Sequence, residues 1–413
     1  MDIAIIGGGA AGMATAYYLN KNGHRVSVYE KQAILGGNIR TLNKNVQVSQ
    51  LAPNIILEAG VVEFPTVFHN FMNLMQELEV ELEPVELGSA IMLKNGQHVL
   101  SPTMIKRNIS GLQKIPEYIR LATVYANAAK LWLKTNWTTW PRIKLLKNGE
   151  HLYDQPLSQY VSQDNDGNNW FKSLVMYSYS IPFSNIGAVP AELAISAIRD
   201  YVWADWVRIK GGVYTYIDKI TQQLNGDIIL NANISSINRS NNRVKVVLDN
   251  KTVHEFDKVV FATPPDQVLQ TLSDPSPEEL KHFKEWKNNQ AFTTIHTDTS
   301  MYDRYNMAQS SEFDFFETES CWGYNCSLNQ LCGLDSKTHY NLSYNLASLI
   351  DKNKIILTQE HNTPLYTVDA LHYRDEIIDN NGNNNTYHAG AYLYDGLHEG
   401  AISSASDVAN LIG

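Results

Sequence analysis

A glycine-rich turn between a short strand and a helix is the feature that most constrains the fold of this chain. Residues 2–6 form an apolar run typical of a buried strand, residues 7–12 read GGGAAG, and residues 13–20 favour a helix. In a G-x-G-x-x-G turn the first glycine allows a tight bend, the second lets a pyrophosphate approach the backbone, and the third lets helix and strand pack closely. The helix N-terminus offers N–H groups to phosphate. We predict a dinucleotide site that includes Gly7, Gly9, Ala10, Ala11 and Gly12.

A second strand over residues 24–29 ends at an acidic residue, Glu30. A carboxylate at this place in a βαβ unit accepts hydrogen bonds from the ribose hydroxyls of a dinucleotide. Residues 36–41 then form a second glycine-rich turn with a basic residue. FAD extends further than NAD, and a second backbone approach suits its pyrophosphate and ribityl chain. We therefore predict FAD, with further contacts from Glu30, Lys31, Gly37, Asn38 and Arg40.

From these residues onward the chain resembles the superfamily of flavin amine oxidases, phytoene desaturases and protoporphyrinogen oxidases, in which an acid is soon followed by G-G-x-x-R-T. Residues 206–212 resemble the W-x-x-x-x-G-G entry to the middle helix of that family, residues 228–265 its returning strands, and residues 387–401 its closing motif. The resemblance implies that residues 58–60 belong to the crossover beneath the flavin ring. The cofactor contacts that it implies are Glu58, Gly60, Ile234, Ala262, Thr263, Pro264, Gly390, Ala391, His398, Glu399, Gly400 and Ala401. Glu58 is either a ribityl contact or a helix cap.

The chain departs from the amine oxidase pattern at two places. Ala391 stands where those enzymes usually carry an acid, and Leu397 and His398 stand where they commonly place an aromatic residue. No cysteine lies near residue 400, so we expect FAD to be bound non-covalently. The residues of these motifs are most similar to those of a bacterial branch of predicted FAD-binding oxidoreductases. They resemble polyunsaturated fatty acid isomerases more distantly.

The positions of the motifs predict an α/β fold with a discontinuous Rossmann-like FAD-binding domain. Its expected segments are residues 1–85, 206–269 and 376–413. The segments between them, residues 86–205 and 270–375, are expected to form an inserted α+β substrate domain of mixed sheet plus helices, as the resemblance implies.

Composition narrows the possible partners. The net charge of −10 and the pI of about 5.6 argue against nucleic acid. The three cysteines, Cys321, Cys326 and Cys332, fit neither a zinc pattern nor a disulfide framework, so we expect no metal. Because the first strand begins at residue 2, we expect no signal peptide and a cytoplasmic protein.

The segment 101–150 has a charge balance unlike that of the rest of the chain. It carries nine Lys and Arg against two Glu, and it contains Trp132, Trp137 and Trp140. Basic helices with tryptophan lie in anionic lipid interfaces, so peripheral contact with the inner face of a membrane is one interpretation. The other is a basic face of the substrate domain whose tryptophans are buried in a core.

The expected chemistry follows from the presence of one dinucleotide fingerprint. Without a second unit for NADPH, the substrate itself is expected to reduce the flavin, with hydride passing to N5. We predict an FAD-dependent dehydrogenase or desaturase with a lipophilic, fatty-acyl-like substrate. An FAD-dependent amine oxidase and a double-bond isomerase without net oxidation are the alternatives, and the oligomeric state stays open.

Candidate polar groups for this chemistry are few. His398 and Glu399, beside the predicted helix N-terminus, are the predicted catalytic residues, and His296 and Asp298 are candidates in the substrate domain. A histidine in such a loop more often forms structural hydrogen bonds with the backbone than it transfers protons. The tyrosines that we expect to line a substrate wall are Tyr177, Tyr179, Tyr344 and Tyr392.

Overall fold

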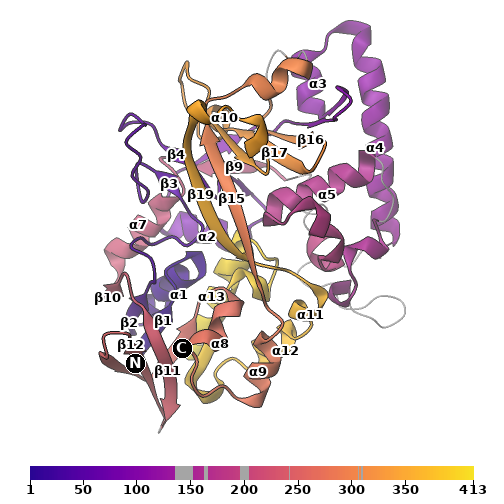
Figure 1. The fold of residues 1–413 in the computed structure, drawn as a ribbon. Coiled ribbons are helices and arrows are strands. Elements are labelled where there is room, and N and C mark those ends of the chain that lie inside the picture. Colours follow the sequence, from indigo (N-terminus) through magenta and orange to yellow (C-terminus); the bar gives the residue numbers. More distant parts are fainter. Residues whose placement is uncertain (135–151, 162–165, 196–203, 241, 306, 308–309) are drawn as a thin grey trace.

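The computed structural model describes residues 1–134, 152–161, 166–195, 204–240, 242–305, 307 and 310–413. Two large sheets organise these residues. In Figure 1 a parallel sheet lies at the lower left, the long strands β15 and β19 run through the middle, and the helices α4 and α5 stand at the right.

The parallel sheet contains five strands in the order β10-β2-β1-β14-β20, and all its pairs are parallel. Their bounds are Gly226–Ile229, Arg25–Tyr29, Asp2–Ile6, Lys258–Phe261 and Thr386–His388. The strand β1 is buried on both faces, as a parallel sheet covered on both sides requires. The helices α1 (Ala10–Lys21) and α13 (His398–Ile412) pack against each other beside it. This arrangement confirms the predicted Rossmann-like unit.

The second sheet contains seven strands in the order β19-β15-β18-β17-β16-β7-β8. Their bounds are Ile355–Pro364, Asn288–His296, Asn341–Tyr344, Trp322–Ser327, Phe313–Glu317, Ser89–Met92 and His98–Leu100. The pair β16–β7 is parallel and the other pairs are antiparallel, so the sheet is mixed, as expected. The helix α5 (Asp166–Tyr179) contacts the strand β17.

Three small sheets contain the remaining described strands. One is the meander β11-β12-β13 (Ile234–Ser240, Arg243–Leu248, Val253–Phe256), whose pairs are antiparallel. The sheet β5-β9-β6 (Phe64–Pro65, Trp206–Ile209, Leu82–Val85) and the pair β3-β4 (Thr41–Leu42, Leu57–Glu58) link distant segments of the chain. The remaining described α-helices are α2 (His69–Glu77), α3 (Pro102–Asn108), α4 (Lys114–Lys134), α7 (Tyr214–Gln223), α8 (Val268–Thr271), α9 (Pro277–Phe283), α10 (Leu328–Leu331), α11 (Val368–Leu371) and α12 (Arg374–Asp379).

The domain bounds expected from the sequence stay a proposal. The boundary near residue 85 falls between β6 and β7, which belong to different sheets. The helix α9, within the expected substrate segment 270–375, is joined instead to β11 by the ion pair of Glu279 and Arg239 at 2.5 Å. No helix in the described ranges is both long and apolar enough to cross a membrane.

Candidate active site

The predicted cofactor residues follow the carboxyl ends of parallel strands. The chain runs from β1 through β2 to β10 in one direction along the sheet, and later adds β14 and β20 on the other side of β1. The strand order therefore reverses between β1 and β14, and ligands of open α/β sheets bind outside the carboxyl ends of the strands at such a point. Gly7 follows β1, Glu30 follows β2, Ala262 follows β14, and Gly390 lies two residues beyond β20.

The two glycine-rich turns, residues 7–12 and 36–41, contact each other although they are separated in the sequence. The N–H of Gly36 donates to the carbonyl of Gly8 at 2.8 Å, and a Cβ added to Gly37 would lie 3.0 Å from the Cα of Gly9. A Cβ at Gly12 would lie 1.9 Å from the carbonyl oxygen of Gly7, so the helix approaches the turn as closely as the motif predicts. The second turn thus lies directly against the first, as expected if both contact one extended dinucleotide.

The acid at the end of β2 is fixed by backbone donors. Glu30 is 7% exposed, and its carboxylate accepts hydrogen bonds from the N–H of Gly8 at 2.7 Å and of Gln32 at 2.8 Å. This contact ties the acid to the glycine turn, which is the placement that ribose recognition requires. Its neighbour Lys31 is exposed, and Ile234 is the first residue of β11.

The buried guanidinium of Arg40 lies beside these turns. Arg40 is 4% exposed and donates to the carbonyl of Ile39 at 3.0 Å and to Gln32 at 2.5 Å. Burial lowers its pKa, and within the described residues it forms no ion pair. Thr263 Oγ1, beyond β14, is also buried without a described partner. A buried cation and a free hydroxyl near the glycine turns fit the anionic pyrophosphate of a dinucleotide.

The crossover at residues 58–60 packs on the second glycine turn. A Cβ at Gly60 would lie 2.2 Å from the carbonyl oxygen of Asn38. Glu58 is buried and accepts hydrogen bonds from the N–H of Val213 at 2.7 Å and from the hydroxyl of Thr41 at 2.9 Å. Burial raises the pKa of Glu58 to about 8. The acid thus holds the start of α7, as expected of a cap, and its predicted contact with the ribityl chain stays a prediction.

The closing motif is held by an aspartate that sequence reasoning did not select. Asp395 accepts hydrogen bonds from the N–H of Leu397 at 2.8 Å and of Gly400 at 2.9 Å, and so caps α13. The carboxylate lies so close that a Cβ at Gly400 would be 2.4 Å from it. The N–H of Gly390 donates to Ser404 in the same helix. An aspartate shortly before a helix is a capping signal, which makes Asp395 recognisable in the sequence.

His398 and Glu399 face the protein interior. His398 Nε2 is 2.8 Å from the hydroxyl of Tyr216, and burial lowers the pKa of the imidazole to about 4. Glu399 accepts hydrogen bonds from the N–H groups of Asn70 at 2.9 Å and Phe71 at 3.0 Å, at the start of α2. These contacts fasten α13 to α7 and α2. The catalytic role predicted for both residues stays a prediction, and the contacts are those of positioning residues.

A wall of aromatic side chains covers the face of the mixed sheet that meets α5. Tyr177 from α5 stacks on Phe313 with ring centroids 5.0 Å apart and meets Tyr324 edge-on at 5.0 Å. Tyr324 in turn stacks on Tyr344 at 5.2 Å. Two of the four predicted tyrosines therefore belong to this wall. Of the others, Tyr179 donates to the carbonyl of Asp395, and Tyr392 contacts Trp286.

A single carboxyl group enters the described part of this wall. Glu63 is 9% exposed, its Oε1 accepts a hydrogen bond from Tyr177, and its Oε2 is buried without a partner among the described residues. Burial raises the pKa of Glu63 to about 7. Sequence reasoning missed this residue, although an acid inside the apolar run of residues 61–64 was a visible signal.

The two candidates in the substrate domain lie on the opposite face of that sheet. His296 is fully buried, accepts from the N–H of Asp298 at 3.1 Å and contacts Ser343 at 2.9 Å. Asp298 pairs with Lys354 at 3.0 Å. Because successive residues of a strand face opposite sides, Asn325, which also contacts His296, points away from the wall that its neighbour Tyr324 joins. His296 and Asp298 therefore form a closed structural network.

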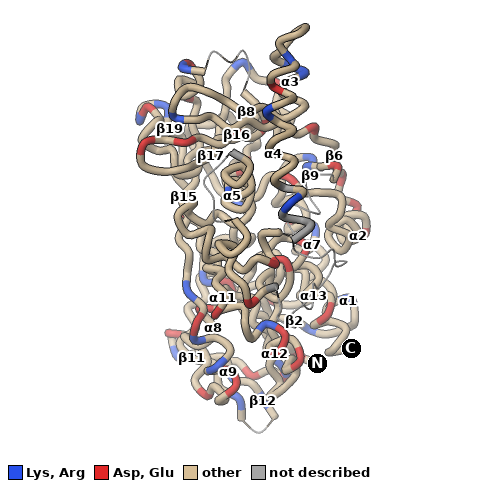
Figure 2. Tube along the Cα trace, turned by 90° about the vertical axis from the view of Figure 1, so that its right-hand side faces the viewer, with Lys and Arg blue, Asp and Glu red and all other residues tan. Residues whose placement is uncertain are grey.

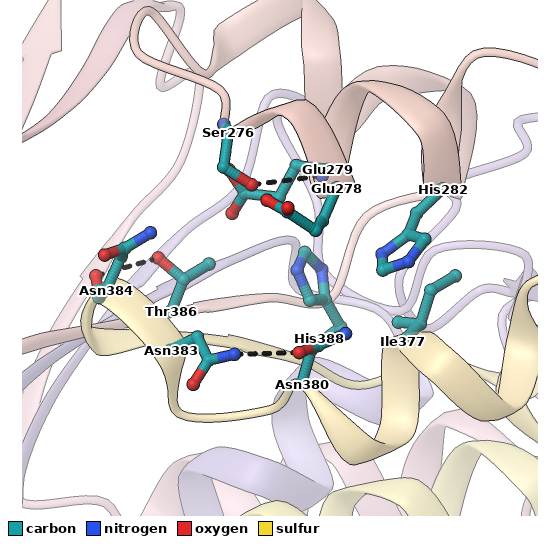
Figure 3. A pocket seen from close by; sticks show the side chains of 10 residues that line it. All are labelled: Ser276, Glu278, Glu279, His282, Ile377, Asn380, Asn383, Asn384, Thr386 and His388. Atoms are coloured by element: carbon teal, nitrogen blue, oxygen red, sulfur yellow. Dashed lines mark hydrogen bonds between the residues drawn. The ribbon is translucent and has the colours of Figure 1, made fainter.

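A separate pocket of about 460 Å³ opens between α9 and the segment that carries β20 (Figure 3). Its lining is polar and includes the asparagines Asn380, Asn383 and Asn384 together with His388. None of the predicted cofactor residues lines it. This pocket is therefore not the dinucleotide site. No group of histidine, cysteine and acidic residues suited to a metal ion occurs in the described part of the chain.

Comparisons with known proteins agree with this geometry. Residues 10–297 match the family model described as flavin containing amine oxidoreductase. A 1-hydroxycarotenoid 3,4-desaturase from Flavobacterium sp. (strain P99-3) is 22% identical over 300 residues, which cover 66% of this chain and 59% of that protein. The chain thus spans about three fifths of the length of this relative.

Two solved structures share the fold at low identity. The fatty acid isomerase from P. acnes that produces CLA superposes with a TM-score of 0.72 and 16% identity, over 99% of this chain and 98% of the other. Wild-type putrescine oxidase bound to putrescine gives a TM-score of 0.69 and 14% identity, over 100% and 98%. Since the family model covers more than half of the chain, the chain belongs to the flavin-containing amine oxidoreductase family.

Proposed function

We propose that this enzyme is an FAD-dependent dehydrogenase or desaturase that acts on a lipophilic substrate such as a fatty-acyl chain. FAD, when bound, would supply the acceptor of a hydride at N5. The observation that carries the proposal is the aromatic wall around Tyr177, which holds one carboxyl group, that of Glu63, within the described residues. Such a surface suits a hydrocarbon chain, because aromatic side chains offer large apolar area.

Glu63 completes the proton balance of a dehydrogenation. Removing two hydrogens from adjacent carbons sends one as hydride to the flavin and the other as a proton to a base, while the electrons of the second C–H bond form the new C=C bond. In this proposal Oε2 of Glu63, which is buried and has no hydrogen-bond partner among the described residues, accepts the proton. Tyr177 holds Oε1 in place. A buried carboxyl whose pKa is near 7 suits a general base at neutral pH.

The same carboxyl group favours one alternative. A carboxylate surrounded by aromatic rings also binds an ammonium group, through charge and cation–π attraction. An amine oxidase is therefore the second candidate, with Glu63 as the site of amine binding. Ala391, which replaces the acid usual in amine oxidases, does not support it.

The deciding experiment records the visible spectrum of the holoenzyme under anaerobic conditions. Unsaturated fatty acid, phospholipid and a panel of amines are added separately, and the recovered lipid is analysed. Bleaching by lipid with a new double bond supports the proposal, and bleaching by an amine alone overturns it in favour of the second candidate. An unchanged spectrum with a shifted double bond identifies an isomerase.

Glu63→Gln tests the role of the carboxyl group in the same assay. The amide has the shape of the acid but cannot take up a proton at neutral pH. We expect normal flavin content and lipid binding, with flavin reduction slowed by about 10²-fold or more. Tyr344→Phe is the matched control, since it alters a wall residue without touching the carboxyl group. Equal rates in Glu63→Gln and the wild type would refute the base assignment.

A further inference from the structure

An exposed apolar face on the helix α4 points to a further interaction. The side chains of Leu112, Ile115 and Ile119 are 82%, 54% and 64% exposed. They belong to the short 3₁₀ turn Gly111–Gln113 and to the first turns of α4. Because residues three and four apart share a face of a helix, these three side chains lie on one side.

The same face stays apolar along the helix. Ala122 and Ala126 continue it and are exposed, and no charged residue occurs between Arg120 and Lys130. The opposite face is the one that the protein core uses, since Leu121 and Val124 are buried and α4 contacts α5 and β8. A surface helix in water normally carries its charged residues on the side away from the core. The exposed side of α4 breaks this rule over several turns.

Basic residues predominate in the segment that carries this apolar face. Of the charged residues at 101–130, five are basic and one, Glu117, is acidic. Arg107 is paired with Glu312 and Glu86, whereas Lys106 and Lys114 form no ion pair within the described residues. In Figure 1 the helix α4 stands at the right-hand edge of the molecule and extends into the upper part of the view, and Figure 2 views the molecule from that side.

We propose that the exposed face of α4, with Leu112, Ile115 and Ile119 at its N-terminal end, docks the enzyme on an anionic lipid bilayer. Aliphatic side chains would enter the boundary of the acyl chains, and the neighbouring lysines would contact the lipid headgroups. A helix with an apolar face and flanking cations is the arrangement that binds in the plane of such an interface. The proposal is independent of the proposed function, because lipid binding is measured without turnover.

The tryptophans Trp137 and Trp140 of the basic segment lie outside the described residues and take no part in this argument. What the structure adds is the exposure of the aliphatic residues, which the sequence alone did not reveal. The exposed aliphatic residues and the lysines Lys106 and Lys114 come from one short stretch of the chain, residues 106–119.

The test measures co-sedimentation of the holoenzyme with phosphatidylcholine vesicles that contain phosphatidylglycerol, beside vesicles of pure phosphatidylcholine. We expect binding to the anionic vesicles that added salt weakens. Ile115→Glu/Ile119→Glu should lower the partition coefficient by at least about tenfold, because charges replace two aliphatic side chains that would be buried in the bilayer. Lys106→Glu/Lys114→Glu should reduce binding to anionic vesicles alone.

The matched control replaces exposed apolar residues elsewhere. Val253 and Leu280 are 52% and 47% exposed and lie on β13 and α9, so Val253→Glu/Leu280→Glu should bind within about twofold of the wild type. Unchanged melting temperature and FAD content show that each variant is folded. Failure of the wild type to sediment, or equal binding by the Ile115→Glu/Ile119→Glu variant, overturns the proposal. Self-association that only this variant abolishes, without vesicle binding, would identify a second copy of the chain as the partner instead.

Discussion

The glycine turn makes a prediction that separates cofactor binding from folding, because two of its glycines have different reasons to be glycine. Gly9 has φ −80° and ψ −171°, a conformation that every L-residue adopts, and a Cβ there would meet only Gly37, at 3.6 Å. The protein alone therefore has room for a Cβ atom at Gly9. At Gly12 an added Cβ would lie 1.9 Å from a backbone oxygen of Gly7, so the chain itself forbids one.

The expected magnitudes follow from these distances. Gly9→Val should leave the unfolding free energy of the apoprotein within about 0.5 kcal/mol of the wild type, as for a substitution without clash. It should abolish FAD binding, because the side chain occupies the predicted approach of the pyrophosphate. FAD at a hundred times its Kd stabilises a protein by about 2.7 kcal/mol, and this gain should vanish in the variant. Gly12→Ala should destabilise the apoprotein by about 1–3 kcal/mol or more, since backbone must move.

The assay is thermal unfolding of each protein as apoprotein and with added FAD, together with the flavin absorbance after gel filtration. The wild type should melt a few degrees higher with FAD, whereas Gly9→Val should melt at one temperature in both conditions. Full flavin content in Gly9→Val would refute the assignment of the pyrophosphate site. An undisturbed Gly12→Ala apoprotein would refute the packing argument.

Three further predictions concern buried charged groups. If Glu63 is the base, anaerobic flavin reduction should speed up as the pH rises through about 7, where the carboxyl group loses its proton, and the Glu63→Gln variant should show a flat profile. Glu399→Gln should lower thermal stability by about 1–2 kcal/mol, because an amide cannot replace both charge-assisted contacts to α2; a loss of flavin reduction without a loss of stability would instead support its catalytic role. Burial lowers the pKa of His296 from 6.5 to about 4, so its contribution to stability is present above pH 6.5 and lost as the pH falls toward 4. Urea unfolding of His296→Gln over this range should show a shallower acid limb, and an unaltered slope would contradict the assignment.

The sequence predicted the flavin side of the fold well because its signals are local. The residues from 2 to 41 carry a strand, two turns, a helix and an acid whose relations depend on backbone geometry over short spans. The strand β1, the helix α1, and the contact of Gly8 with Glu30 follow from that local order. The bounds differ by small amounts, since α1 begins at Ala10 and not at residue 13.

Prediction from the sequence was weaker where one residue type is compatible with several roles. Glu58 was consistent with a ribityl contact or a cap, and only the approach of Val213 from a distant segment revealed the capping contact. His398 and Glu399 were predicted as flavin-side polar groups, and only the structure revealed their contacts with Tyr216 and with the start of α2. A side chain's partner is decided by elements that are far away in the sequence.

By itself, then, the sequence determined the dinucleotide fold, the FAD assignment and the basic character of residues 101–150, because each rests on short-range backbone geometry or on composition. Tertiary structure alone decided that one oxygen of Glu63 has no partner among the described residues of an aromatic wall, and that Ile115 and Ile119 are exposed. Both depend on which surfaces the core leaves uncovered. Periodicity finds an apolar face, but only packing decides whether that face is buried.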